Sequence, residues 1–99
     1  MSRNDDKVEV ENVNVPGHVT RVDRAKYTAM RKALLRVMPR GAPGISAKQA
    51  KAKALPLLPD DLFPNGEKSG WWLKTVQLDL EAKKLLRRAP TKPLTFYRP

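Results

Sequence analysis

The sequence contains no cysteine and a single histidine, His18, and these shortages remove the parts that several kinds of chemistry need. Without cysteine there is no disulfide and no thiolate ligand for a metal. One histidine leaves Ser–His and Cys–His nucleophile pairs and histidine-rich metal sites without most of their members. The glycine-containing segment PRGAPG lacks the strand, lysine and hydroxyl context of a phosphate-binding loop. We therefore expect no enzyme activity, no catalytic residue, no metal and no cofactor.

Long apolar runs are missing as well. None approaches the ~20 residues that a membrane-spanning helix needs, and the N-terminal segment MSRNDDKVEVEN lacks the apolar core of a secretory signal. We expect a cytoplasmic protein without membrane contact, in agreement with the lack of cysteine. A length of 99 residues with 40% hydrophobic and 30% charged residues indicates one folded domain over residues 1–99. We expect residues 1–6 to form a disordered tail.

Acidic residues are scarce and unevenly placed. Twenty Lys and Arg oppose ten Asp and Glu, which gives a net charge of +10 and a pI of about 10.3. Residues 1–20 hold two basic and four acidic residues, a net of −2, so residues 21–99 hold 18 basic and six acidic residues, a net of +12. A positive field attracts phosphates and releases their counterions on contact. The charge favours a polyanionic partner, with basic charge that serves only solubility as the alternative.

Short hairpins are predicted at both ends of the chain. In KVEVENVNVPGHVTRV, residues 7–22, valines alternate with polar residues, the phase slips at residues 11–12, and Pro16-Gly17 offers a turn. Near the C-terminus, LLRR and LTFYR flank a turn at residues 89–93 and are typical of two paired strands.

Three helices are predicted between these hairpins, over residues 23–38, 46–58 and 70–84. Each begins at, or directly after, a residue whose side chain can accept hydrogen bonds from the free N–H groups at a helix start. Pro56 should end or kink the second helix. The predicted caps are Asp23, Ser46 with Gln49 at capping-box spacing, and Ser69.

Two of the six aromatic residues are adjacent, Trp71 and Trp72, in the first turn of the third predicted helix. At about 100° per residue, Trp72 joins the apolar side of the helix and is expected in the core. We expect Trp71 to pack as well, since paired aromatics at helical positions are usually structural; the alternative is partial exposure. The opposite, polar face consists of Lys74, Gln77, Glu81 and Lys84.

The order of these elements, from residue 23 to residue 98, resembles a winged helix-turn-helix domain. The stretches ENVNVPGHVTRVD, LPDDLFPNGEKSGWWLKTVQLDLEAK and TKPLTFYR are also similar to a family of small, functionally uncharacterised bacterial proteins. The winged-helix resemblance implies an α+β fold in which the third helix enters the major groove and the C-terminal hairpin, the wing, touches the backbone. The connection over residues 59–68 departs from the pattern, since helix-turn-helix turns have about three or four residues.

The resulting hypothesis is a small winged-helix protein that binds nucleic acid, with duplex DNA as the expected partner. The third helix and the wing would contact phosphates, Gln77 would read bases, and free N–H groups at the helix start would suit a phosphate. The predicted contact residues are Lys68, Ser69, Lys74, Gln77, Lys84, Arg87, Arg88 and Lys92.

The alternative is a protein-interaction module on the same frame, since a fold alone does not settle function. It would dock a partner through the N-terminal hairpin or through the Leu62–Phe63 connection. The acidic N-terminal segment could pair with the basic surface of a second copy and form a homodimer.

Overall fold

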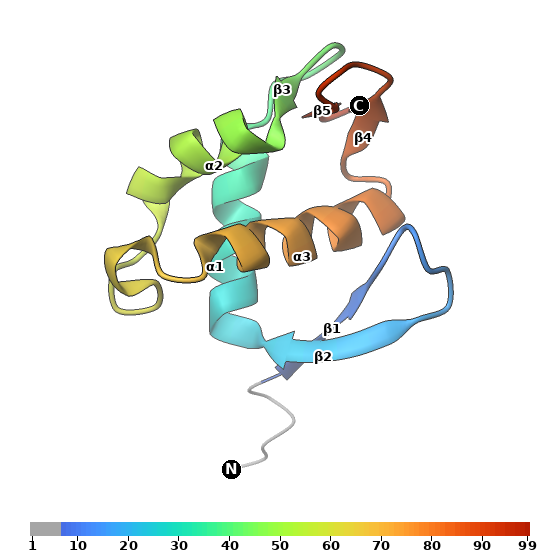
Figure 1. The fold of residues 1–99 in the computed structure, drawn as a ribbon. Helices are drawn as coiled ribbons and strands as arrows, with labels where there is room; N and C mark the ends of the chain where they lie inside the picture. Colours follow the sequence, from blue (N-terminus) through green and yellow to red (C-terminus); the bar gives the residue numbers. More distant parts are fainter. Residues whose placement is uncertain (1–6) are drawn as a thin grey trace.

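The structure, a computed structural model, describes residues 7–99; residues 1–6, for which the sequence predicts a disordered tail, lie outside the described residues. It is an α+β fold with three helices, in a winged-helix-like arrangement (Figure 1). The elements in chain order are β1 (Lys7–Glu11), β2 (Val19–Asp23), α1 (Arg24–Val37), β3 (Ile45–Ser46), α2 (Ala47–Ala54), the 3-10 turns η2 (Leu55–Leu57) and η3 (Pro64–Gly66), α3 (Ser69–Ala82), β4 (Arg87–Ala89) and β5 (Thr95–Tyr97).

One hydrophobic core joins the three helices. Helix α1 contacts both α2 and α3, and α3 crosses in front of it (Figure 1). Buried side chains from α1, such as Leu34, and from α3, such as Val76 and Leu80, belong to one cluster. Phe63, from the long connection, joins this cluster and packs edge-on against Trp72, with ring centroids 6.4 Å apart. The connection that departs from the helix-turn-helix pattern is therefore folded onto the core.

The helix starts follow the predicted capping chemistry in two of three cases. The Asp23 carboxylate accepts a hydrogen bond from the backbone N–H of Lys26 at 2.9 Å. Ser46 and Gln49 form the reciprocal capping box. The prediction for the third helix is wrong, because the residue before α3 is Lys68 in a left-handed conformation, and Ser69 is the buried first residue of the helix.

The helix ends differ from the predicted ones for local reasons. Helix α2 ends at Ala54, and Pro56, which cannot donate a helical hydrogen bond, lies in the 3-10 turn that follows. Helix α3 ends at Ala82, and Lys84 takes a positive φ of 65°. The polar helical face predicted to extend to Lys84 therefore stops earlier.

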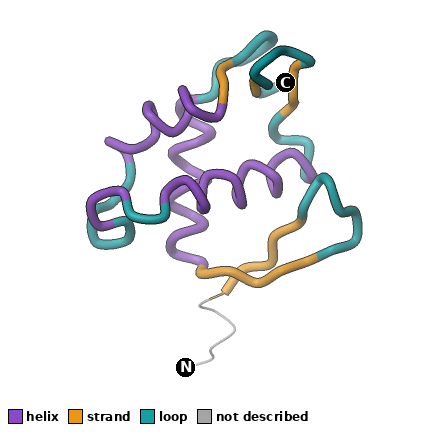
Figure 2. The backbone as a smooth tube through the Cα atoms, viewed as in Figure 1, coloured by secondary structure: helices purple, strands orange, loops and turns teal. Residues whose placement is uncertain are grey.

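Two separate sheets lie at opposite ends of α1 (Figure 2). The N-terminal hairpin pairs β1 with β2, with Val8 opposite Val22, and its loop over residues 12–18 replaces the longer alternation that the sequence predicts. The C-terminal sheet has the strand order β3-β5-β4 and pairs both Ile45 and Arg88 with Phe96. The wing strands β4 and β5 confirm the predicted C-terminal hairpin. Strand β3 was not predicted, because two residues are too few to show an alternating pattern.

The close approach of β3 to β5 requires glycine at position 44. Gly44 has φ +81°, and a Cβ there would collide with the backbone carbonyl of Phe96. Gly41 has nearly the same φ, +82°, with nothing within 4 Å of its Cβ position.

Gly41→Ala should cost about 1–2 kcal/mol of stability for its left-handed backbone alone. Gly44→Ala should cost about 1–3 kcal/mol more, because the backbone must also move. Urea unfolding of both variants measures the difference, and equal stabilities would contradict this account.

The tryptophan pair generates a second prediction. Trp72 is 7% exposed and Trp71 is 58% exposed, so the expectation for Trp72 is confirmed and the expectation that Trp71 is also packed in the core is wrong. Trp72→Ala should destabilise the protein by about 3–5 kcal/mol, the usual cost of deleting a buried large aromatic side chain. Trp71→Ala is the matched control and should cost less, about 0.5–1.5 kcal/mol, for the lost edge-to-face contact with Trp72. Thermal unfolding compares the two, and a Trp72→Ala midpoint near that of the wild type would refute the core position.

Candidate nucleic-acid interface

A groove of about 800 Å³ lies between α2, α3 and the wing. Its cations are Lys48 and Lys51 from α2, Lys74 from α3 and Arg88 from β4, and no acidic residue lines it. Its apolar wall includes Leu73, Leu78, Leu94 and Phe96. We call this hollow the basic groove. No residue of the connection over 59–68 lines it, so the long connection leaves it open.

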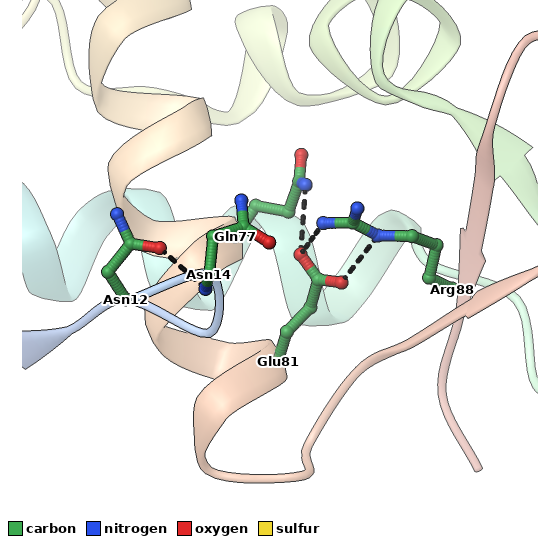
Figure 3. Close-up of polar contacts among 5 residues, drawn as sticks. All are labelled: Asn12, Asn14, Gln77, Glu81 and Arg88. Atoms are coloured by element: carbon green, nitrogen blue, oxygen red, sulfur yellow. Dashed lines mark hydrogen bonds and ion pairs between the residues drawn. The ribbon is translucent and has the colours of Figure 1, made fainter. Parts of the chain in front are cut away.

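A chain of hydrogen bonds ties α3 to the wing at one side of the basic groove (Figure 3). The Gln77 side-chain amide donates to Oε2 of Glu81 at 3.1 Å. Arg88 donates to both carboxylate oxygens of Glu81, at 2.9 and 3.0 Å, and lies over the Phe96 ring at 5.6 Å from its centroid. The hydrogen bond to Glu81 raises the pKa of Arg88 above its ordinary value. This paired geometry fixes the wing relative to α3.

The same contacts change what two predicted contact residues can do. Gln77 is 6% exposed and its amide donates to Glu81, so little of the side chain faces the groove, and base reading by Gln77 stays a prediction. Arg88 reaches the groove, but its charge is balanced by Glu81. Three of the eight predicted contact residues line the basic groove: Lys74, Gln77 and Arg88.

The other predicted residues lie elsewhere. Ser69 is 2% exposed, so its side chain cannot meet a phosphate. Arg87 neighbours Arg88 on β4, and successive strand residues point to opposite faces, so Arg87 faces away from the groove. Lys92 is exposed in the wing turn, next to the groove-lining residues Pro93 and Leu94. Lys68 and Lys84 are exposed at the two ends of α3, outside the groove.

The solvent-facing ridge of α3 differs from the predicted polar face. It consists of Trp71, Lys74 and Leu78, which follow one another at helical spacing. Lys74 and Leu78 line the basic groove. Trp71 and Leu78 line a second hollow of about 160 Å³ between α3 and the N-terminal hairpin. The ridge thus separates two hollows, with Leu78 common to both.

A buried carboxylate holds α3 in this orientation. Asp79 is fully buried and accepts hydrogen bonds from the Tyr27 hydroxyl of α1, from the backbone N–H of Glu11 at 2.8 Å, and from Lys83, with which it forms an ion pair. Burial, followed by the hydrogen bond to the Asp79 carboxylate, raises the pKa of Tyr27 above its ordinary value of 10.0. Because its partners come from α1, β1 and the end of α3, Asp79 joins three segments.

Sequence reasoning missed Lys48, Lys51 and Asp79. The two lysines are three positions apart in α2 and interleave with the small residues Ala47 and Ala50, so helical periodicity could have placed them together beside the packing face. Asp79 gave no signal, because its spacing on α3 does not reveal whether partners from other elements reach it.

Residues 7–96 match the model of a family of unknown function (DUF6958). The chain belongs to this family. Because the match spans nearly the whole described chain, the hairpin, the three helices and the wing all lie within the DUF6958 region. Comparison with the curated proteins and with the solved structures finds no match. Among residues 7–99 of this DUF6958 protein, no helix has the length and apolar character to span a bilayer.

The Tyr27–Asp79 contact predicts a loss of stability at high pH. A tyrosine whose pKa is higher in the folded than in the unfolded state contributes stability that is complete below the unfolded pKa of about 10. That stability is lost as the pH rises above this value, because the unfolded chain releases its proton first. Tyr27→Phe should reduce this decline, and at pH 7 should cost about 1–3 kcal/mol for the lost hydrogen bond to a buried carboxylate.

Urea unfolding between pH 7 and about pH 11, a range that brackets the unfolded tyrosine pKa, measures both effects. Tyr97→Phe, on half-buried β5, is the control and should keep the alkaline decline. An identical decline in Tyr27→Phe and wild type would contradict the proposed contribution of this pair.

Proposed function

We propose that this DUF6958 protein binds nucleic acid through the basic groove and the adjoining wing. The observation that carries the proposal is the grouping of Lys48, Lys51 and Lys74 around one groove whose lining contains no acidic residue. Among residues 7–99, none of these three lysines forms an ion pair. Like charges in one place repel each other in the free protein, and a chain of phosphates relieves that repulsion and releases counterions.

The distribution of acids supports the same partner. The two acids of α3, Asp79 and Glu81, are buried and paired with Lys83 and Arg88, so they add little negative potential to the ridge. The excess of positive charge, a net +10, is therefore carried at the surface by exposed lysines and arginines. Lys92 in the wing turn extends the positive surface beyond the groove, whereas Arg87 lies on the opposite face of β4. These contacts position a backbone without reading sequence, so we expect weak sequence preference.

The protein-interaction alternative keeps one specific observation in its favour. The N-terminal hairpin exposes Val13, Val15 and Val19, an apolar group that a partner could cover. The Leu62–Phe63 connection offers no such surface, because Phe63 is buried in the core. A homodimer, a bacterial origin and a cytoplasmic location remain predictions alongside the proposed function.

Salt dependence tests the proposal. Phosphate contacts from Lys48, Lys51, Lys74 and Lys92 should give a slope of log K against log salt of about −3.6 on duplex DNA, at ~0.9 per neutralised phosphate. The double variant Lys48→Gln/Lys51→Gln should flatten the slope by about 2. Fluorescence anisotropy with labelled DNA over a salt series measures both slopes.

The control carries the same change in charge on a different element. Lys32→Gln/Arg36→Gln alters two exposed cations of α1 that line neither hollow, and it should leave the slope nearly unchanged. Equal flattening by both double variants would mean that binding follows net charge alone. Absence of binding at low salt would refute the nucleic-acid function.

A further inference from the structure

We propose that the basic groove and the α3 ridge select unpaired nucleotides over intact duplex. In this arrangement Lys48, Lys51 and Lys74 hold the phosphates, while Trp71 and the apolar wall take the exposed faces of the bases. The inference rests on the proposed nucleic-acid function and names the substrate class for that same surface.

The apolar wall of the groove favours unpaired nucleotides. Leu73, Leu78, Leu94 and Phe96 line the same hollow as the lysines, and Leu94 is 43% exposed. A duplex presents charged phosphates and sugars outward and keeps the flat faces of its bases stacked inside. A duplex backbone on this surface would pair with the lysines and leave the accessible surfaces of Leu78 and Leu94 in water. An unpaired strand has both kinds of group available, anionic phosphates and apolar base faces.

Trp71 offers an exposed ring on which a base can stack. It is 58% exposed, the largest exposed fraction among the large hydrophobic side chains of the described chain, although it lies next to the core residue Trp72. The two rings meet edge to face, with centroids 5.0 Å apart at 81°, so the buried ring orients the exposed one. An exposed tryptophan held in a fixed orientation beside lysines is the arrangement on which unpaired bases stack.

Polar groups around Trp71 suit base edges. The smaller hollow beside Trp71 is also lined by the polar residues Asn12, His18, Thr20 and Thr75 and by one acidic residue, Glu11. These side chains offer both hydrogen-bond donors and acceptors, which a base edge can use. Because Leu78 lines both hollows, a strand that crosses the ridge can reach the smaller hollow and the lysines together. Acidic peptides share the charge of a nucleic acid but lack planar rings for Trp71, so the observations favour nucleotides.

Tryptophan fluorescence of the full chain tests the proposal directly. The protein has two tryptophans, and Trp72 is buried, so stacking on Trp71 should dominate any quenching. The probes are a thymidine oligonucleotide of about 12 nucleotides, a length within the usual site sizes of single-strand binders, and a blunt duplex of the same length. We expect the single strand to quench and to bind about tenfold more tightly than the duplex, as one or two stacked bases would produce.

Matched variants separate stacking from charge. Trp71→Ala should weaken single-strand binding about tenfold and leave duplex binding unchanged. Leu94→Ala should weaken single-strand binding severalfold, whereas Leu57→Ala, at a position equally exposed (42% against 43%) but outside both hollows, should not. Circular dichroism verifies that each variant is folded, and backbone amide shifts of Lys74 and Leu78 report binding independently of tryptophan.

The outcomes distinguish this inference from the function on which it rests. Equal affinity for single strand and duplex, with no effect of Trp71→Ala, would overturn the preference for unpaired nucleotides and leave nucleic-acid binding intact. No binding of either oligonucleotide at low salt would overturn both. Tighter binding of an acidic Leu–Glu repeat peptide than of the single strand, lost in Leu94→Ala, would overturn both in favour of a protein partner.

Discussion

The buried carboxylate of Asp79 is the constraint on which the arrangement of the molecule depends. A carboxylate removed from water is costly unless donors surround it, and here the donors come from α1, from β1 and from the end of α3. The Asp79 carboxylate therefore has its hydrogen-bond donors only when α1, β1 and the end of α3 lie together. The N-terminal hairpin, which a two-stranded sheet alone would hold weakly, is bound to α3 through the backbone of Glu11.

The rotation of α3 about its own axis follows from this arrangement. With Asp79 directed inward and Glu81 bound to Arg88, both acids of the helix are withdrawn from the surface. Trp71, Lys74 and Leu78 are left on the open side. The separation of paired acids from unpaired lysines lets a chain with ten acidic residues present an acid-free groove.

The wing and the connection complete this surface from its two sides. Arg88 joins the wing to α3 through Glu81 and covers Phe96, so that Leu94 and Phe96 become part of the groove wall. On the other side, packing of Phe63 against Trp72 draws the proline-rich connection onto the core. A connection longer than the usual helix-turn-helix turn thus leaves the groove uncovered.

Local signals in the sequence determined the three helices, two of their caps, the wing strands and the burial of Trp72, because each depends on neighbouring residues or on a regular period. The charge excess was likewise a property of composition. Periodicity treats every polar residue of a helix face alike, so it placed Gln77 and Glu81 with Lys74 on one open surface. Only the tertiary structure decided that Glu81 meets Arg88, that Asp79 meets Tyr27, and that Lys48 and Lys51 lie beside Lys74. Those contacts join residues distant in sequence, and a pattern within one segment carries no information about which partner from another segment will reach it.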